Sequence, residues 1–272
     1  MQEALFWQYA QIVQQNFGIQ LTIEKKALLE SRLFKLFNNK LEQSGFADDE
    51  SFLSYVKEDA SGTALKLLAE AITTHHTFFM REPEHFDFFG RQVLPYLERT
   101  VTDGDVRTWC AACSSGEEAY ILEMQLMDFF EARGPQWDTM LLATDLSYDI
   151  LDTAKAGIYT EEAVSSLPPQ WRAEYFTRLA NGSYQAVGRL RQKILYRRFN
   201  LMTPVFPFKK PFHVIFCRNV MIYFDAPTRD ALVRKFCDFL EPGGFLFVGH
   251  SEVIDRQTAS FEYIMPSVYR KR

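Results

Sequence analysis

Two blocks of the chain alternate short apolar segments with tight turns and helices, and this alternation constrains the fold more than any other feature. Apolar strands are expected at residues 106–112, 140–145, 212–217 and 245–249, with helices between them at 117–130, 148–155 and 227–240. Strand–turn–helix alternation of this kind is typical of a parallel sheet covered by helices. An α/β fold is therefore expected for the C-terminal two-thirds of the chain.

The first 80 residues carry no strand pattern, because their apolar residues recur at helical spacing. Helices are expected at residues 5–17, 23–41, 49–55, 64–72 and 84–100. Asp48 and its neighbours can cap the third of these helices. We predict an all-α domain over residues 1–72, a linker over 73–85 and an α/β domain over 86–272.

The alternation breaks at about residues 160–199, where turn signals cluster. Short antiparallel strands are expected there at residues 184–187 and 190–196. They predict a small antiparallel β insertion within the α/β domain. Two further strands are expected at residues 261–264 and 267–270.

Composition and charge exclude several classes of protein. The chain has 272 residues and a formal net charge of −5 at pH 7, which fits poorly with non-specific nucleic-acid binding. No segment approaches the roughly 18 apolar residues that a membrane span needs, and the first residues carry no basic signal region. We therefore expect a cytoplasmic monomer that inserts into no membrane.

The four cysteines, Cys110, Cys113, Cys217 and Cys237, are interpreted as reduced thiols of a cytosolic protein. Cys110 and Cys113 have the spacing of half a metal or redox site, but no second ligand pair has metal spacing. The five histidines form no zinc motif. No metal site is predicted.

In open α/β sheets, ligands bind at the carboxyl ends of the strands, so the residues after each strand are candidates for a site. Gly116 follows the first strand, and Glu117 and Glu118 begin the next helix. The chain lacks the GxGxxG fingerprint, which argues against a nicotinamide dehydrogenase. Two acids at a helix start suit a cationic ligand, such as the ammonium of a methionine moiety. Alternatively, they only complement the helix dipole.

Two more strand ends carry polar residues. Asp145 follows the second strand and can accept hydrogen bonds from both hydroxyls of a ribose, or it can simply cap the next helix. Arg218 and Asn219 follow the strand at 212–217, where a charged side chain must face solvent or a ligand. The chain lacks the Asn/Asp-Pro-Pro-Tyr/Phe loop of many amine methyltransferases, which argues against an amine substrate.

The linker from Thr73 to Pro83 combines polar groups with aromatic side chains. A segment of this kind can fold over a cofactor as a lid. Alternatively, it is a plain joint between domains, with Arg81 in a salt bridge.

Taken together, these stretches resemble the chemotaxis receptor methyltransferases, the CheR family. The most specific stretch is Phe216-Cys217-Arg218-Asn219-Val220-Met221-Ile222-Tyr223-Phe224-Asp225. The other similar stretches are residues 73–86, 109–120, 143–146, 156–159, 199–201, 212–215 and 242–252. They follow one another over nearly the whole chain.

The resemblance implies a Rossmann-like methyltransferase domain that uses S-adenosylmethionine (SAM) as its cofactor. By position, it assigns cofactor binding to His75, Thr77, Arg81, Glu118, Asp145, Asn200, Leu201, Arg218 and Asn219. It also places Arg81 and Tyr223 near the methyl-transfer centre, as catalytic residues. Two positions depart from the family pattern, because His75 stands where Asn is usual and Met80 stands where Phe is usual.

The implied reaction methylates glutamate side chains of chemotaxis receptors, giving glutamyl methyl esters and S-adenosylhomocysteine (SAH) for sensory adaptation. A free glutamate has a pKa of about 4.3, so the nucleophile is ionised at neutral pH and needs no general base. Two alternatives stay open. The chain could be a non-catalytic adaptor that binds cofactor and receptor, or it could serve a chemosensory pathway unrelated to motility.

Two partner contacts are expected. Residues 21–43 carry more basic than acidic side chains, and Lys25, Arg32 and Lys35 could bind the Glu-rich helices of a receptor. Alternatively, these basic residues only form a solvent-exposed helix face and bind no partner. In the family, the β insertion can also bind a receptor's C-terminal peptide by strand addition.

Overall fold

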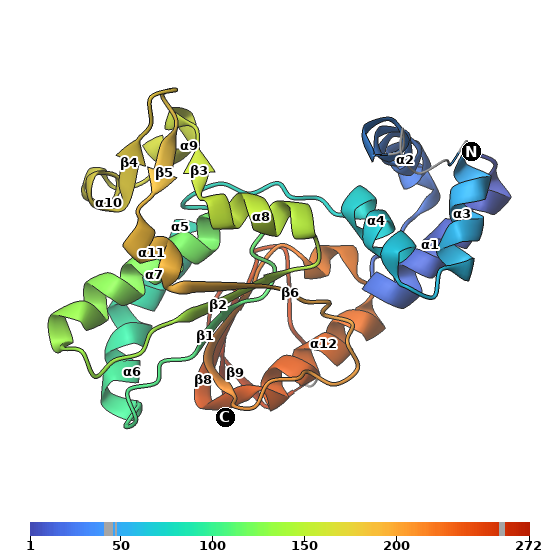
Figure 1. Cartoon of the computed structure of the whole chain (residues 1–272). Helices are drawn as coiled ribbons and strands as arrows, with labels where there is room; N and C mark the ends of the chain where they lie inside the picture. The colour runs from blue at the N-terminus through green and yellow to red at the C-terminus, as the bar shows by residue number, and fades with distance from the viewer. Residues whose placement is uncertain (41–45, 47, 256–258) are drawn as a thin grey trace.

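The computed structural model describes residues 1–40, 46, 48–255 and 259–272, and it is built around one seven-stranded sheet (Figure 1). The strand order is β6-β2-β1-β7-β8-β10-β9. The strands span Thr108–Cys110 (β1), Leu141–Asp145 (β2), Ile194–Arg198 (β6), Phe212–Cys217 (β7), Leu240–Val248 (β8), Phe261–Met265 (β9) and Val268–Lys271 (β10). The five strands from β6 to β8 run parallel, and β10 is antiparallel to both of its neighbours. The parallel sheet predicted from the sequence is confirmed.

Successive residues of the central strands point to opposite faces of this sheet, and each face has its own core. Phe216 faces the core formed with α7 (Glu117–Phe130), whereas its neighbour Ile215 faces the core formed with α12 (Ala226–Asp238). Because both faces are covered, the strands are apolar throughout rather than alternating, as parallel strands usually are. Truncating a ring such as Phe216 to alanine would cost about 3–5 kcal/mol of stability.

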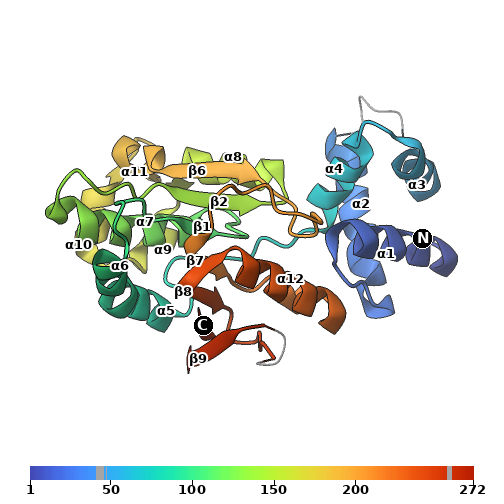
Figure 2. The same ribbon diagram turned by 90° about the horizontal axis from the view of Figure 1, so that it is seen from below.

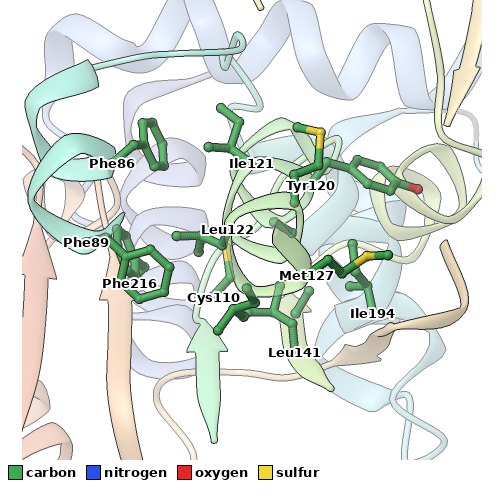
Figure 3. Packing of buried hydrophobic residues seen from close by; sticks show 14 of the residues in the cluster. Phe86, Phe89, Cys110, Tyr120, Ile121, Leu122, Met127, Leu141, Ile194 and Phe216 are labelled. Carbon is green, nitrogen blue, oxygen red and sulfur yellow. The ribbon is translucent and has the colours of Figure 1, made fainter. Parts of the chain in front are cut away.

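Aromatic rings fill the first of these cores. Phe216 stacks on Phe247 with a ring-centroid distance of 4.1 Å. Phe86 and Phe89 also pack against Phe216 (Figure 3). Phe86 belongs to α5 (Pro83–Phe88), which continues through a π-helical turn (Phe89–Val93) into α6 (Leu94–Thr100). The single helix predicted over residues 84–100 is therefore one continuous rod with a π turn in its middle.

The N-terminal region is helical, as predicted. Its helices are α1 (Glu3–Phe17), α2 (Lys26–Lys40, preceded by a 3-10 turn at Ile23–Lys25), α3 (Asp49–Glu58) and α4 (Thr63–Ile72). The predicted cap is present, because the Asp48 side chain accepts from the Ser51 backbone N–H at 2.8 Å. The apolar faces enclose a separate core that includes Phe6, Leu33 and Leu68. Residue 41, where the second helix was predicted to end, lies outside the described residues.

The predicted β insertion exists, but part of its predicted extent is wrong. Its small antiparallel sheet has the order β3-β5-β4, with β3 at Ile158–Tyr159, β4 at Phe176–Arg178 and β5 at Tyr184–Ala186. It also contains the short helices α9 (Glu161–Ser165) and α10 (Pro169–Tyr175).

The segment predicted as an antiparallel strand at residues 190–196 belongs to the main sheet instead. It forms the end of α11 (Gly188–Gln192) and the start of β6, which pairs in parallel with β2. A parallel neighbour needs a long crossover, and α8 (Tyr148–Ala156) together with the insertion supplies it. Strand direction depends on this connection rather than on local sequence, which is why the residues alone did not reveal it.

The N-terminal helices lie beside the carboxyl ends of the strands, to one side of the α/β region (Figure 2). Glu70 of α4 accepts hydrogen bonds from the Ser147 hydroxyl and, at 2.7 Å, from the Tyr148 backbone N–H. Asn200 donates from Nδ2 to the Asn16 carbonyl at 2.7 Å. These bonds fix the helices next to the residues that follow β2 and β6.

The linker over residues 73–82 leaves α4 and crosses the top of the sheet before α5 begins (Figure 1). All four cysteines lie in the described part of the chain and are buried and free. No helix within the described residues combines the length and the apolar character that a membrane span requires.

Candidate functional site

A single cavity at the carboxyl ends of β1, β2 and β7 collects the residues that the sequence singled out. It measures about 1080 Å³ including its opening to solvent. The linker forms one wall, and α1 and the residues just after it contribute Phe17 and Ile19. The predicted site residues that line it are His75, Thr77, Arg81, Glu118, Asp145, Asn200, Leu201, Arg218, Asn219 and Tyr223. The structure therefore brings all of them together.

Arg81 sits in a strained turn of the linker. Its neighbours Met80 and Glu82 both have left-handed backbones, with φ of 60° and 56°. Such conformations are unfavourable for residues other than glycine and cluster at functional sites. The Arg81 carbonyl accepts a hydrogen bond from Arg218 Nη2 at 2.5 Å, and its own Nη1 donates to the His76 carbonyl at 3.0 Å.

The turn after β1 brings one of its two acids to the cavity. Gly116 has a φ of 99°, and an added Cβ would lie 3.0–3.1 Å from Ala154 and two tyrosine hydroxyls, so only glycine fits. Glu118 lines the cavity, whereas Glu117 is buried and accepts from the Ser115 hydroxyl at 2.6 Å. Burial raises the pKa of Glu117. Only Glu118 can therefore meet a ligand.

Asp145, at the end of β2, is held in place by two backbone donors. Its Oδ2 accepts from the Ser114 N–H at 2.9 Å and its Oδ1 from the Ser147 N–H at 3.2 Å. The cap of α8 is Ser147, whose hydroxyl accepts from the Ile150 N–H at 3.1 Å. The alternative in which Asp145 caps this helix is therefore wrong. A carboxylate has about four lone-pair sites, so Asp145 keeps acceptors for a ligand.

Arg218 is almost wholly enclosed, with 1% of its side chain exposed. Its guanidinium pairs with Glu118 at 2.7 Å and with Glu82 at 2.9 Å. Burial opposes the charged form, but the two carboxylates outweigh it and raise the pKa of Arg218. Arg218 is thus a permanent cation that orients two acids, one of which faces the cavity.

Sequence reasoning missed Glu252, which holds the turn after β7. Its carboxylate accepts from the backbone N–H groups of Asn219, Met221, Ile222 and Gly249, at 2.9, 2.6, 3.2 and 2.6 Å. No local signal marks this role, because three of its four donors come from the turn after β7, 30–33 residues away in sequence.

The remaining predicted residues serve partly as supports. The Asn200 amide is anchored to Asn16 and accepts from the Met202 N–H at 2.9 Å. The His75 ring nitrogen Nε2 lies 2.8 Å from the Thr73 hydroxyl, so the ring is fixed by its own linker. The alternative in which Arg81 makes a domain-joint salt bridge is wrong, because no described carboxylate pairs with it.

Tyr223 lies at the mouth of the cavity, in the 3-10 turn Met221–Tyr223. Its backbone carbonyl accepts from the Gln20 N–H at 2.8 Å, which ties this turn to the N-terminal region. The Lys25 ammonium lies 5.8 Å from the centre of its ring. Tyr223 therefore links the cavity to the basic 3-10 turn that precedes α2.

A possible metal cluster lies next to the cavity. Glu82, His85 and His250 hold ligand atoms within 4.8 Å of one another. The Glu82 carboxylate, however, is already paired with Arg218 at 2.9 Å, and this fixed cation opposes a metal ion there. The donor set does not favour a metal at this place.

The donors of the cavity do fit SAM. Asp145 offers acceptors to ribose hydroxyls, and Glu118 offers a carboxylate to a cationic end. Phe17, Phe78 and Phe199 supply apolar wall. When bound, SAM supplies an activated methyl group on its sulfonium.

Comparisons with known proteins agree with this fit. Residues 75–269 match the family described as "CheR methyltransferase, SAM binding domain". The chain is 39% identical over 263 residues to a chemotaxis protein methyltransferase of Borreliella burgdorferi, covering 96% of this chain and 91% of that protein. It is 31% identical over 273 residues to a chemotaxis protein methyltransferase of Escherichia coli, covering 99% of this chain and 91% of that protein.

A probable chemotaxis protein methyltransferase of Rhizobium etli is 35% identical over 264 residues, with 95% of this chain and 96% of that protein covered. The similarity thus extends over the N-terminal helices as well as the α/β region. Together with the acids and the linker that surround the cavity, it settles the family. The chain belongs to the CheR methyltransferase family, its fold is that of a SAM-dependent methyltransferase, and SAM is its cofactor.

Proposed function

We propose that this methyltransferase transfers the methyl group of SAM to glutamate carboxylates of chemotaxis receptors, forming glutamyl methyl esters and SAH for sensory adaptation. The names of its relatives support a role in chemotaxis. The ester-forming reaction rests on the chemistry of the cavity, and one observation carries it: the cation Arg81 lines the cavity without a carboxylate partner among the described residues.

Arg81 can receive an anionic substrate. A guanidinium has five N–H donors, and Arg81 uses one of them in its hydrogen bond to the His76 carbonyl. Arginine matches the two oxygens of a carboxylate in a paired geometry, which fixes the orientation of the acceptor. Because Arg218 is fully engaged by Glu82 and Glu118, Arg81 is the guanidinium that remains for the substrate.

The reaction then needs alignment more than proton transfer. A glutamate carboxylate is ionised at neutral pH, so it is a competent nucleophile without a general base. Arg81 orients it, and the Tyr223 hydroxyl donates a hydrogen bond to its second oxygen. The linker excludes water from one side of the cavity. Holding the reacting atoms in line and away from water accounts for the rate enhancement.

The other lining residues hold the cofactor. Asp145 binds the ribose, and Glu118 binds the cationic methionine end. His75, Thr77, Asn200, Leu201 and Asn219 complete the pocket, and Arg218 contributes mainly by orienting Glu118. This assignment follows from the free acceptors of Asp145 and from the ion pair between Glu118 and Arg218.

The receptor docks on α2 and on the 3-10 turn before it, through a smaller cationic group than the sequence suggested. Arg32 donates to the Ile72 carbonyl and, at 2.7 Å, to the Thr74 hydroxyl, so it supports the linker. Lys25 and Lys35 remain available, and Lys25 lies beside Tyr223 at the cavity mouth. A receptor C-terminal peptide would add to an edge of the small sheet, next to β3 or β4. We also propose a cytoplasmic location, where receptor signalling helices are accessible.

Methyl transfer from tritiated SAM to receptor-containing membranes tests this function. The protein should label the receptor, and mild base should release the label, because a glutamyl methyl ester hydrolyses while a methylamine does not. Binding of SAH without transfer would identify an adaptor and contradict the proposal. Base-stable label would place the methyl group on another atom.

A further inference from the structure

Glu82 lies behind the cavity and contacts residues that line it. Its carboxylate accepts from Arg218 Nη2 at 2.9 Å, from Asn219 Nδ2 at 3.2 Å and from the His250 backbone N–H at 3.3 Å. Glu82 is not among the cavity-lining residues, and only 12% of its side chain is exposed. Any effect of Glu82 on the cofactor must therefore pass through its neighbours.

The backbone of Glu82 shows that its position is imposed by these contacts. Its φ of 56° is unfavourable for a residue with a side chain, and Pro83 follows it at the start of α5. Such a conformation persists where surrounding contacts over-determine it. Here the hydrogen bonds of the carboxylate and the fixed start of α5 hold it.

The charged groups around Arg218 include more negative than positive charges. One guanidinium lies between two carboxylates, at 2.7 Å from Glu118 and 2.9 Å from Glu82. Burial alone would raise the pKa of the Glu82 carboxyl, but Arg218 and the N–H donors hold this pKa below its usual range. The group therefore carries a net charge of one negative unit at neutral pH.

A neighbouring histidine does not change this sum. The His85 ring is fully buried beside Glu82, and burial, assisted by the Arg218 charge, lowers the pKa of His85 to about 4. The ring is neutral at pH 7 and adds no positive charge. Among the described residues, none in direct contact with Glu82 balances this excess negative charge. It therefore contributes to the electrostatic potential at Glu118.

We infer that Glu82 is a positioning residue that shares Arg218 with Glu118 and thereby keeps Glu118 available as an anion for the cationic end of the cofactor. The inference rests on the proposed placement of that end beside Glu118. Without the charge of Glu82, Arg218 pairs with Glu118 alone and the pair is neutral. The cationic end is the ammonium of the methionine part, which SAM and SAH share, so Glu82 matters for both of them. It matters less for 5′-methylthioadenosine, which keeps the adenosine and the sulfur but lacks this ammonium.

Titration calorimetry of the full-length protein with SAH and with 5′-methylthioadenosine tests this. For Glu82→Gln, SAH affinity should fall about tenfold and 5′-methylthioadenosine affinity about twofold, a shift of about fivefold in the ratio of the two Kd values. Glu82→Asp keeps the charge and suits a left-handed backbone, so it should restore most of the ratio. Glu84→Gln is the matched control, because Glu84 pairs with the exposed His250 instead of Arg218.

Equal weakening of SAH and 5′-methylthioadenosine in Glu82→Gln would contradict the inference, because a purely structural role affects both ligands alike. Glu118→Gln distinguishes a failure of the inference about Glu82 from a failure of the proposed cofactor placement. If it shifts the ratio and Glu82→Gln does not, the inference fails while the cofactor placement stands. If neither shifts the ratio, the placement itself is wrong. Loss of SAM affinity in the unaltered protein on adding a chelator would instead make Glu82 a metal ligand and also contradict the inference.

Discussion

The carboxylate of Glu252 holds the backbone N–H of Asn219 at 2.9 Å, and this bond ties the turn after β7 to the turn after β8. Asn219 has a left-handed φ of 59°, and an added Cβ at Gly249 would lie 2.4 Å from its side chain. The two turns therefore pack without room for adjustment. One buried acid sets the position of the Arg218-Asn219 pair that lines the cofactor cavity.

Replacing Glu252 with glutamine should destabilise the protein and weaken SAM binding. The new amide would present N–H donors to backbone N–H groups, leaving buried donors unsatisfied. We expect a loss of about 2–4 kcal/mol in the free energy of unfolding, because the lost acceptor is ionised and buried. Urea unfolding measures this loss of stability, with Glu262→Gln, at an exposed position of β9, as the control. Unchanged stability would show that the four hydrogen bonds contribute nothing net.

Arg81→Ala should lower turnover more than cofactor affinity. The orienting contact to the substrate carboxylate is lost, while Asp145 and Glu118 still hold SAM. We expect turnover to fall about a hundredfold, as when one charge-stabilising donor is removed from an active site. Receptor methylation at saturating SAM gives the turnover, and calorimetry gives the affinity. Arg91→Ala, an exposed arginine of the π-helical turn, should change neither. Unchanged turnover of Arg81→Ala would remove Arg81 from the reaction.

Asp145→Asn should weaken SAM and SAH alike. The ribose is common to both, and losing a charge-assisted acceptor costs about 1.5–3 kcal/mol, or roughly tenfold to a hundredfold in Kd. 5′-Methylthioadenosine, which has the same ribose, should be weakened equally, in contrast to the pattern expected for Glu82→Gln. Asp152→Asn removes an exposed carboxylate of α8, the helix that follows β2, and serves as the control. A selective loss of SAM binding alone would place the ribose elsewhere.

Stability should fall as the pH drops from about 6.5 towards 4, partly through His85. Burial lowers the pKa of His85 to about 4, below its ordinary value in the unfolded chain. Its contribution is therefore complete above about pH 6.5 and is lost as the pH falls towards the folded value, by about 1–3 kcal/mol in total. Urea unfolding of His85→Gln and of the unaltered protein across this range measures it. Identical pH dependence in both proteins would exclude this role of His85.

Charge reversal at Lys25 and Lys35 should raise the KM for receptor about tenfold and leave SAM binding unchanged. The effect should shrink as salt rises, since exposed charges act over about one Debye length. Arg32 is left unaltered because it supports Ile72 at the end of α4 and Thr74 of the linker. The control is Lys66→Glu, at an exposed position of α4. Loss of SAM binding in the double variant would indicate damage to the Tyr223 turn instead of to a docking surface.

Much of this arrangement was predictable because it depends on local patterns. The strand at Phe212–Cys217 was predicted at its observed bounds, since an apolar run bounded by turns specifies a buried parallel strand. Polar residues after such strands converge at one edge of the sheet, which is why Asp145 and Arg218 were expected to lie close together, as they do in the cavity.

Other features depend on long-range contacts and left no local trace. The direction of β6 follows from the crossover that precedes it, and its residues 194–198 read equally well in either direction. The burial of Arg218 depends on acids 136 and 100 residues away in sequence. Glu82 and Glu252 look like ordinary surface acids until the turns that they contact are known.

Mass spectrometry of receptor peptides after incubation with the protein and SAM identifies which atom receives the methyl group. We expect the added mass of a methyl ester on glutamate residues of the signalling helices. Mild base should remove it, and it should be greatly reduced with Arg81→Ala. A methyl group on another side chain, or none on a receptor that the protein binds, would contradict the assignment of a protein-glutamate methyltransferase.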